Sequence, residues 1–261
     1  MNQAGVWLDQ LLVVALSSAR FGFAFVLVPL FSPATIPATV RNSIILTLGG
    51  VAYFLHGAVE PASLDAFDWA RLLLKEAVAG LVIGFLFGTV LWAMEAAGEI
   101  IDAKIGATIG QVLEPHGGTM ISLNGALMGR LAHVLFASAG GIMLLVAAVL
   151  ESFALWPMTA AWPELDMRGL AVLESEFGRL MMLAVLFAAP ALTFLYVIDA
   201  GLGLLNRFAQ QLNVFALSLS IKSWAATLLL MLLIALFAQA VVTDLATRNG
   251  VARGVIRALA R

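Results

Sequence analysis

Long apolar blocks separated by short polar connections dominate this chain. A membrane-spanning helix needs about 20 predominantly apolar residues. Blocks near this length lie at residues 11–31, 44–59, 77–94, 131–150, 180–198 and 224–242. Their apolar residues are contiguous rather than spaced at i, i+3, i+4 and i+7, as they are in a half-buried surface helix. The pattern therefore predicts an all-α membrane protein with about six hydrophobic helices.

Several blocks are imperfect spans. The second has only 16 residues, the first contains Arg20, and the fourth opens with Arg130 and His133. The longest connection, residues 95–130, is half apolar and is interrupted at Glu114-Pro115-His116-Gly117-Gly118. We therefore expect some helices to be broken or to form hairpins, and some blocks to be buried in protein rather than in lipid.

The amino-acid composition excludes several classes of protein. The 261 residues are 62% hydrophobic and 11% charged, whereas soluble domains carry about 25% charged residues. An ordinary soluble enzyme, a disordered protein and a coiled coil are thereby excluded. The net charge of -2 gives no electrostatic footprint for nucleic acid. The absence of cysteine excludes disulfides and thiolate metal sites.

The distribution of charge gives a weak topology signal. Arginines cluster after the last block, at Arg248, Arg253, Arg257 and Arg261, and the positive-inside rule predicts a cytoplasmic C-terminal tail. The first ten residues lack the positive region of a cleavable signal peptide, so we expect the first block to remain in the protein.

Motifs of catalysis are missing from the sequence. There is no HExxH zinc helix, no GxSxG elbow and no phosphate-binding P-loop. His56, His116 and His133 lie far apart, and none has an evident ligand partner nearby. We therefore predict no catalytic residue, no cofactor and no metal site.

Glycines mark a candidate helix-packing face. Gly80, Gly84 and Gly88 are spaced four apart, so they share one helix face and allow another backbone to approach closely. Packing within the chain and packing against a neighbouring subunit both remain open.

Ionisable residues in or beside apolar blocks need a partner or water. Arg20, Lys75, Glu76, Asp199 and Arg207 are of this kind. A structural ion-pair network is the favoured interpretation, with inter-subunit pairing and an ion pathway as alternatives. Lys75 and Glu76 point about 100° apart on a helix, so we do not expect them to pair with each other.

Three acidic residues, Glu95, Glu99 and Asp102, fall on one helical face at spacings of four and three. Like charges at this spacing repel by a few tenths of a kcal/mol. A solvated face is the favoured interpretation, and contact with a basic partner is the alternative. The nearest histidine lies beyond a proline, so we predict no metal site there.

Residues 196–223 read YVIDAGLGLLNRFAQQLNVFALSLSIKS. This segment closely resembles the signature of the FliR/SctT family, the T component of the type III secretion export apparatus. Other parts fit in matching order: Ala19-Arg20, Pro29-Leu30-Phe31, Pro37 and Val40-Arg41, then Lys75-Glu76 with the glycines, then Gly98 to Asp102 and Gly106. One position departs, because Gln210 stands where members commonly carry proline. The ending from Ser218 to Ser223 is more similar to injectisome members than to flagellar ones.

The resemblance implies one subunit of a helical export-gate assembly in the bacterial inner membrane. It implies an R-subunit-like part over residues 1–175, an S-subunit-like hairpin over 176–245 and a basic tail over 246–261. The implied partners are the R and S export-gate subunits, the U-type switch protein, membrane lipid and secreted proteins in transit. Such members form the entry through which unfolded substrates leave the cytoplasm.

The resemblance also suggests roles for single residues. The pore or plug region would include Glu95, Glu99, Asp102, Gly106, Gly110 and Pro115. Arg20, Arg41, Lys75, Glu76, Asp199, Arg207 and Lys222 would form pairs between helices or subunits. Gln211 and Asn213 would satisfy backbone groups at a helix break.

The main alternative from another class is an ion-coupled secondary transporter of a small solute, since broken helices and buried charges also occur there. Transporters tend to contain two related halves, and the sequence contains no convincing internal repeat.

Overall fold

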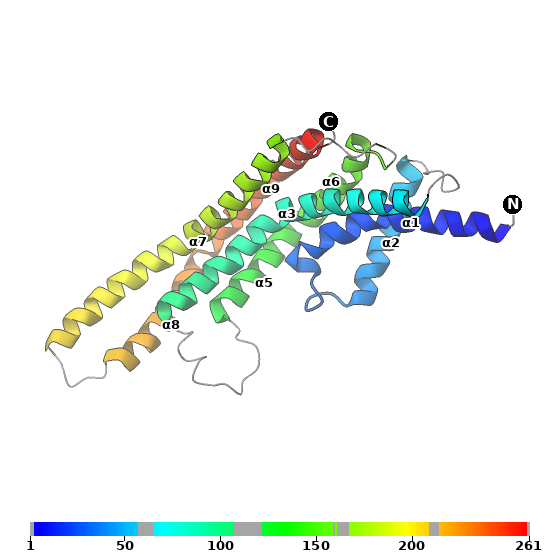
Figure 1. Ribbon diagram of the computed structural model, residues 1–261. Helices are drawn as coiled ribbons and strands as arrows, with labels where there is room; N and C mark the ends of the chain where they lie inside the picture. The colour runs from blue at the N-terminus through cyan, green and yellow to red at the C-terminus, as the bar shows by residue number, and fades with distance from the viewer. Residues whose placement is uncertain are drawn as a thin grey trace. The chain divides into compact units, whose positions relative to one another are not determined.

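A computed structural model describes residues 3–56, 65–106, 122–158, 160, 167–208 and 214–259. Within these residues the chain is helical and has no strand (Figure 1). This confirms the predicted all-α class. The helices are α1 (Gln3–Val26), α2 (Ala38–His56), α3 (Ala66–Ile105), α5 (Leu123–Ser138), α6 (Gly141–Leu155), α7 (Met167–Phe208), α8 (Val214–Leu232) and α9 (Ile234–Leu259), with a short 3₁₀ turn η1 (Pro29–Phe31).

The helices differ in length from the apolar blocks that predicted them. α3 and α7 have 40 and 42 residues, because the charged residues flanking their apolar centres continue the helix. The fourth block is divided between α5 and α6, which are bent by 66° at Gly140. Gly140 has a φ of 80°, a left-handed conformation that favours glycine. The sixth block is divided between α8 and α9, bent by 53°.

Fewer helices can cross a membrane than the six blocks suggested. Among the described residues, three helices are long and apolar enough to cross a membrane, over residues 38–55, 67–105 and 171–208. The number rises to five if each bent pair counts as one span. The first block falls short because its helix ends at Val26, ahead of Pro29, and a proline restricts the residue before it to extended conformations.

The chain forms two compact units. The first comprises Met1–Thr89, Ala137–Phe177 and Asp244–Arg261, and the second comprises Val90–Phe136 and Gly178–Thr243. In the first unit, aromatic side chains fill the core, and the rings of Phe25 and Phe31 stack at 3.9 Å. In the second unit, Phe187 of α7 meets Phe237 of α9 edge-on at 5.8 Å.

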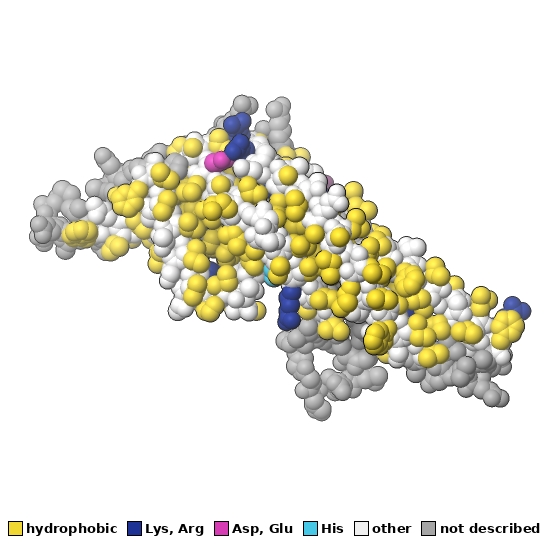
Figure 2. Space-filling view, turned by 180° about the vertical axis from the view of Figure 1, so that it is seen from behind, with side chains coloured by type: hydrophobic (Ala, Val, Ile, Leu, Met, Phe, Trp, Pro, Cys, Tyr) yellow, Lys and Arg dark blue, Asp and Glu magenta, His cyan; other side chains and the backbone are white. Residues whose placement is uncertain are grey.

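Burial differs sharply among the apolar helices. In the most apolar 18-residue stretch of α3, 78% of the residues are buried inside the protein. The corresponding shares for α7 and α2 are only 28% and 11%. Hydrophobic side chains accordingly cover much of the visible face in Figure 2. α3 is therefore a core helix, while α2 and α7 present apolar side chains to lipid or to other subunits.

Candidate functional site

Arg20 and Glu76 form a fully buried ion pair in the first unit. Arg20 Nε donates to Glu76 Oε2 at 2.6 Å, and Nη2 donates to Oε1 at 2.9 Å. Arg20 also donates to the Ser152 hydroxyl at 2.8 Å and to the Trp156 carbonyl at 3.0 Å. Its guanidinium lies 3.9 Å from the ring centre of Phe153. This bidentate geometry ties α1 to both α3 and α6.

Lys75 is the second buried cation of this network. Its ammonium donates to the carbonyl oxygens of Pro157 at 2.8 Å and Ala160 at 3.1 Å, and also to that of Met158. The distance from Lys75 Nζ to Glu76 Oε1 is 4.0 Å, too long for a hydrogen bond. Lys75 therefore forms hydrogen bonds with the segment that follows α6, whereas Glu76 forms its ion pair with Arg20.

The predicted glycine face packs inside the first unit. A Cβ atom at Gly80 would collide with the carbonyl oxygen of Arg20, and one at Gly84 with that of Ala24. Gly88 is also buried. Of the two open interpretations, packing within the chain accounts for Gly80 and Gly84, because they let the backbone of α1 lie directly on α3.

Asp102 caps the helix that follows the longest connection. Its carboxylate accepts hydrogen bonds from the Ser122 hydroxyl at 2.6 Å and from the Asn124 N–H at 2.9 Å. The Asn124 side-chain amide also donates to it, at 2.5 Å. Ser122 in turn accepts from the Gly125 N–H at 3.0 Å, the geometry of an N-cap. The end of α3 is thereby fixed to the beginning of α5.

The prediction that this acidic face is solvated is wrong for Asp102, which is buried. Glu95 is half-buried and Glu99 is exposed. The reason is that glycines bring α5 onto this face: a Cβ at Gly125 would lie 3.0 Å from Glu99 Cγ, and one at Gly129 would lie 3.6 Å from Glu95. The acidic residues therefore line an interhelical contact within the second unit.

Asp199 joins three helices of the second unit. Its carboxylate lies 2.7 Å from Lys104 Nζ of α3 and 3.1 Å from Lys222 Nζ of α8. Lys104 also lies 3.8 Å from the ring centre of Tyr196. The structure thus brings Asp199 and Lys222 together and leaves Arg207 exposed at the end of α7.

Other predicted positions have simpler environments. Gly106 ends α3 with a φ of 90°, and its N–H donates to the Asp102 carbonyl at 3.1 Å. Arg41 donates to the Phe31 carbonyl at 3.2 Å. Gly110, Pro115, Gln211 and Asn213 lie outside the described residues.

Three of the arginines expected in the C-terminal tail, Arg248, Arg253 and Arg257, lie on α9, which is helical through Leu259, and Arg261 lies outside the described residues. Arg248 is buried, and its guanidinium lies 2.7 Å from Glu176 and 3.2 Å from Asp244. Arg253 pairs with Glu151 at 2.5 Å on the surface. Both contacts lie within the first unit.

Several of these partners were missed by sequence reasoning. Ser122 could have been found, because a serine directly before a helix is a common N-cap. Lys104, Glu176 and Glu151 could not, since nothing local marks them as partners of residues so distant in the sequence. Among the described residues, no group of three His, Asp or Glu could hold a metal ion.

An all-α chain with helices long and apolar enough to cross a membrane, buried ion pairs and glycine-mediated helix contacts has the features of a membrane protein. The family described as "Bacterial export proteins, family 1" matches residues 11–247. The chain therefore belongs to this family, and the membership in the FliR/SctT family indicated by residues 196–223 is confirmed.

Individual relatives agree with this assignment. The chain is 32% identical over 223 residues to "Yop proteins translocation protein T" of Yersinia pestis, covering 85% of each chain. It is 31% identical over 222 residues to "Surface presentation of antigens protein SpaR" of Salmonella typhimurium, covering 83% of this chain and 82% of that one. It is 28% identical over 205 residues to "Flagellar biosynthetic protein FliR" of Bacillus subtilis, covering 78% of each.

Proposed function

We propose that this chain, a membrane subunit of the type III secretion export apparatus, helps form the entrance through which unfolded proteins cross the bacterial inner membrane. The observation that carries this proposal is the family match over residues 11–247, nearly the whole chain. The relatives include proteins named for Yop translocation, for surface presentation of antigens and for flagellar biosynthesis. Identity is higher to the first two, which favours an injectisome system.

The surface supports a subunit that works among others. α2 and α7 expose large apolar side chains over most of their length, including Phe54 at 85% and Phe208 at 84% exposure. Surface this apolar needs lipid or protein cover. Its partners in our proposal are the R and S export-gate subunits and the U-type switch protein, with secreted proteins in transit.

The proposed architecture has three parts: an R-like part over residues 1–175, an S-like hairpin over 176–245 and a basic end over 246–261. The hairpin is supported by the pairing of Asp199 on α7 with Lys222 on α8. The basic end is proposed to lie on the cytoplasmic side, by the positive-inside rule.

The proposed pore region lies around residues 106–118. Its support is the hydrogen bonding of Asp102 with Ser122 and Asn124. These hydrogen bonds hold the end of α3 and the beginning of α5 together on the two sides of the proposed pore region.

Native mass spectrometry of the detergent-extracted protein tests the proposed function. The expected result is one particle containing this chain together with several other membrane subunits. Deleting the chain from the bacterium should abolish secretion of type III substrates while general secretion continues. A stable monomer that transports a small solute in liposomes would overturn the proposal and support a secondary transporter.

A further inference from the structure

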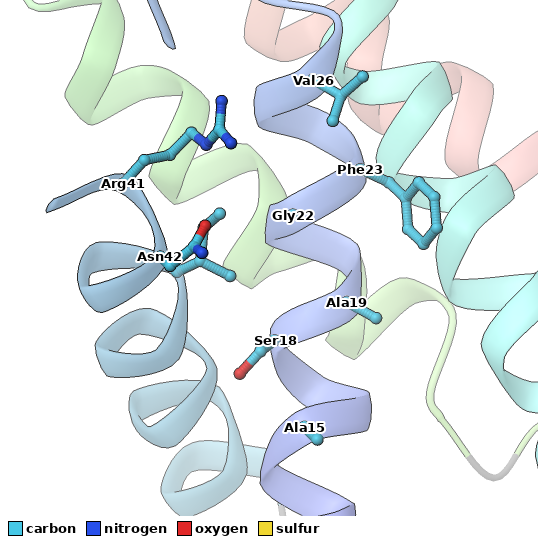
Figure 3. A pocket seen from close by; sticks show the side chains of 9 residues that line it. Ala15, Ser18, Ala19, Gly22, Phe23, Val26, Arg41 and Asn42 are labelled. Carbon is cyan, nitrogen blue, oxygen red and sulfur yellow. The ribbon is translucent and has the colours of Figure 1, made fainter. Parts of the chain in front are cut away.

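We draw no further inference here: the strongest candidate, the open apolar groove between α1 and α2 that is lined by Ala15, Gly22 and Arg41 (Figure 3), carries nothing because nothing in the structure shows what covers it.

Discussion

Arg20 and Glu76 place opposite charges at the centre of the first unit, where neither is reached by water. Taking two charges out of water is expensive, and their attraction offsets this cost only when the geometry is good and further hydrogen bonds are made. Here both carboxylate oxygens are bonded, and Ser152 and Trp156 take up other guanidinium donors. The pair therefore fixes the relative positions of α1, α3 and α6.

The first prediction concerns this pair. Glu76→Leu should lower the free energy of unfolding by about 3–5 kcal/mol, because it leaves Arg20 charged and buried without a counter-ion. The double variant Arg20→Met/Glu76→Leu should be clearly more stable than Glu76→Leu, because no buried charge remains unpaired. Thermal unfolding in detergent measures both. Arg253→Ala, which breaks an exposed pair, should hardly change the midpoint. A double variant no more stable than the single one would contradict this account.

The second prediction concerns the shared carboxylate of the second unit. Asp199→Asn leaves Lys104 and Lys222 close together without their common counter-ion, and we expect reduced recovery of the complex and reduced secretion. The cost in stability should be about 1 kcal/mol or less, because all three side chains are partly exposed. Arg130→Gln is the control, because Arg130 is an exposed residue of α5 in the same unit, and this variant should leave both readouts unchanged. Equal losses in the two variants would show that Asp199 has no special role.

At the scale of the elements, glycines decide which helices can touch α3. Gly80 and Gly84 admit the backbone of α1 in the first unit, and Gly98 admits Asn124 at the beginning of α5 in the second. Without a hydrophobic driving force between helices in lipid, close backbone packing is a main source of association. A side chain at these positions would therefore separate two helices rather than merely shift a neighbour.

The third prediction follows from that contact. Gly84→Ala should destabilise the protein by about 1–3 kcal/mol, the usual cost of overpacking a tight contact, because the added Cβ meets the carbonyl of Ala24. Gly178→Ala on α7 is the control. It has nothing within 4 Å of the added Cβ, and alanine favours helix by up to about 1 kcal/mol. It should therefore be neutral or slightly stabilising. The comparison uses unfolding midpoints in detergent, and a Gly84→Ala protein as stable as wild type would refute the close-packing account.

At the scale of the whole molecule, the chain combines a rigidly fixed loop base with large apolar surfaces. Asp102 holds α3 and α5 together on the two sides of the proposed pore region. The exposed apolar faces of α2 and α7 suit a position among lipid and other subunits. These features fit the membership of the chain in the bacterial export family.

The fourth prediction tests the loop base. Asp102→Ala leaves the Ser122 hydroxyl and the Asn124 N–H without their buried acceptor, which costs about 1–3 kcal/mol, and it releases the end of α3 from the beginning of α5 beside the proposed pore region. We expect normal or slightly lower amounts of the complex but impaired secretion and a higher ion leak in cells that produce it. Glu174→Gln, which changes an exposed acid on α7 outside the proposed pore region, should leave the leak at the wild-type level. If both variants secrete normally and neither leaks, the loop base does not control the gate.

The sequence by itself determined the class and the family of this protein. Contiguous apolar blocks are local information, and they predict helices whatever the rest of the chain does. The motif at residues 196–223 is likewise contiguous, so it could be identified without any tertiary contact. The glycine spacing predicted a close helix contact at Gly80 and Gly84 but not the helix that makes it.

Only the tertiary structure decided the partners. Asp199 pairs with Lys104, and Arg248 with Glu176, across long stretches of sequence. Asp102, expected on a solvated face, is buried because Gly98 and Gly125 let α5 close over it. Helical periodicity fixes which residues share a face, but the element that covers the face depends on how the helices fold back on one another. Packing therefore determined which charges became structural.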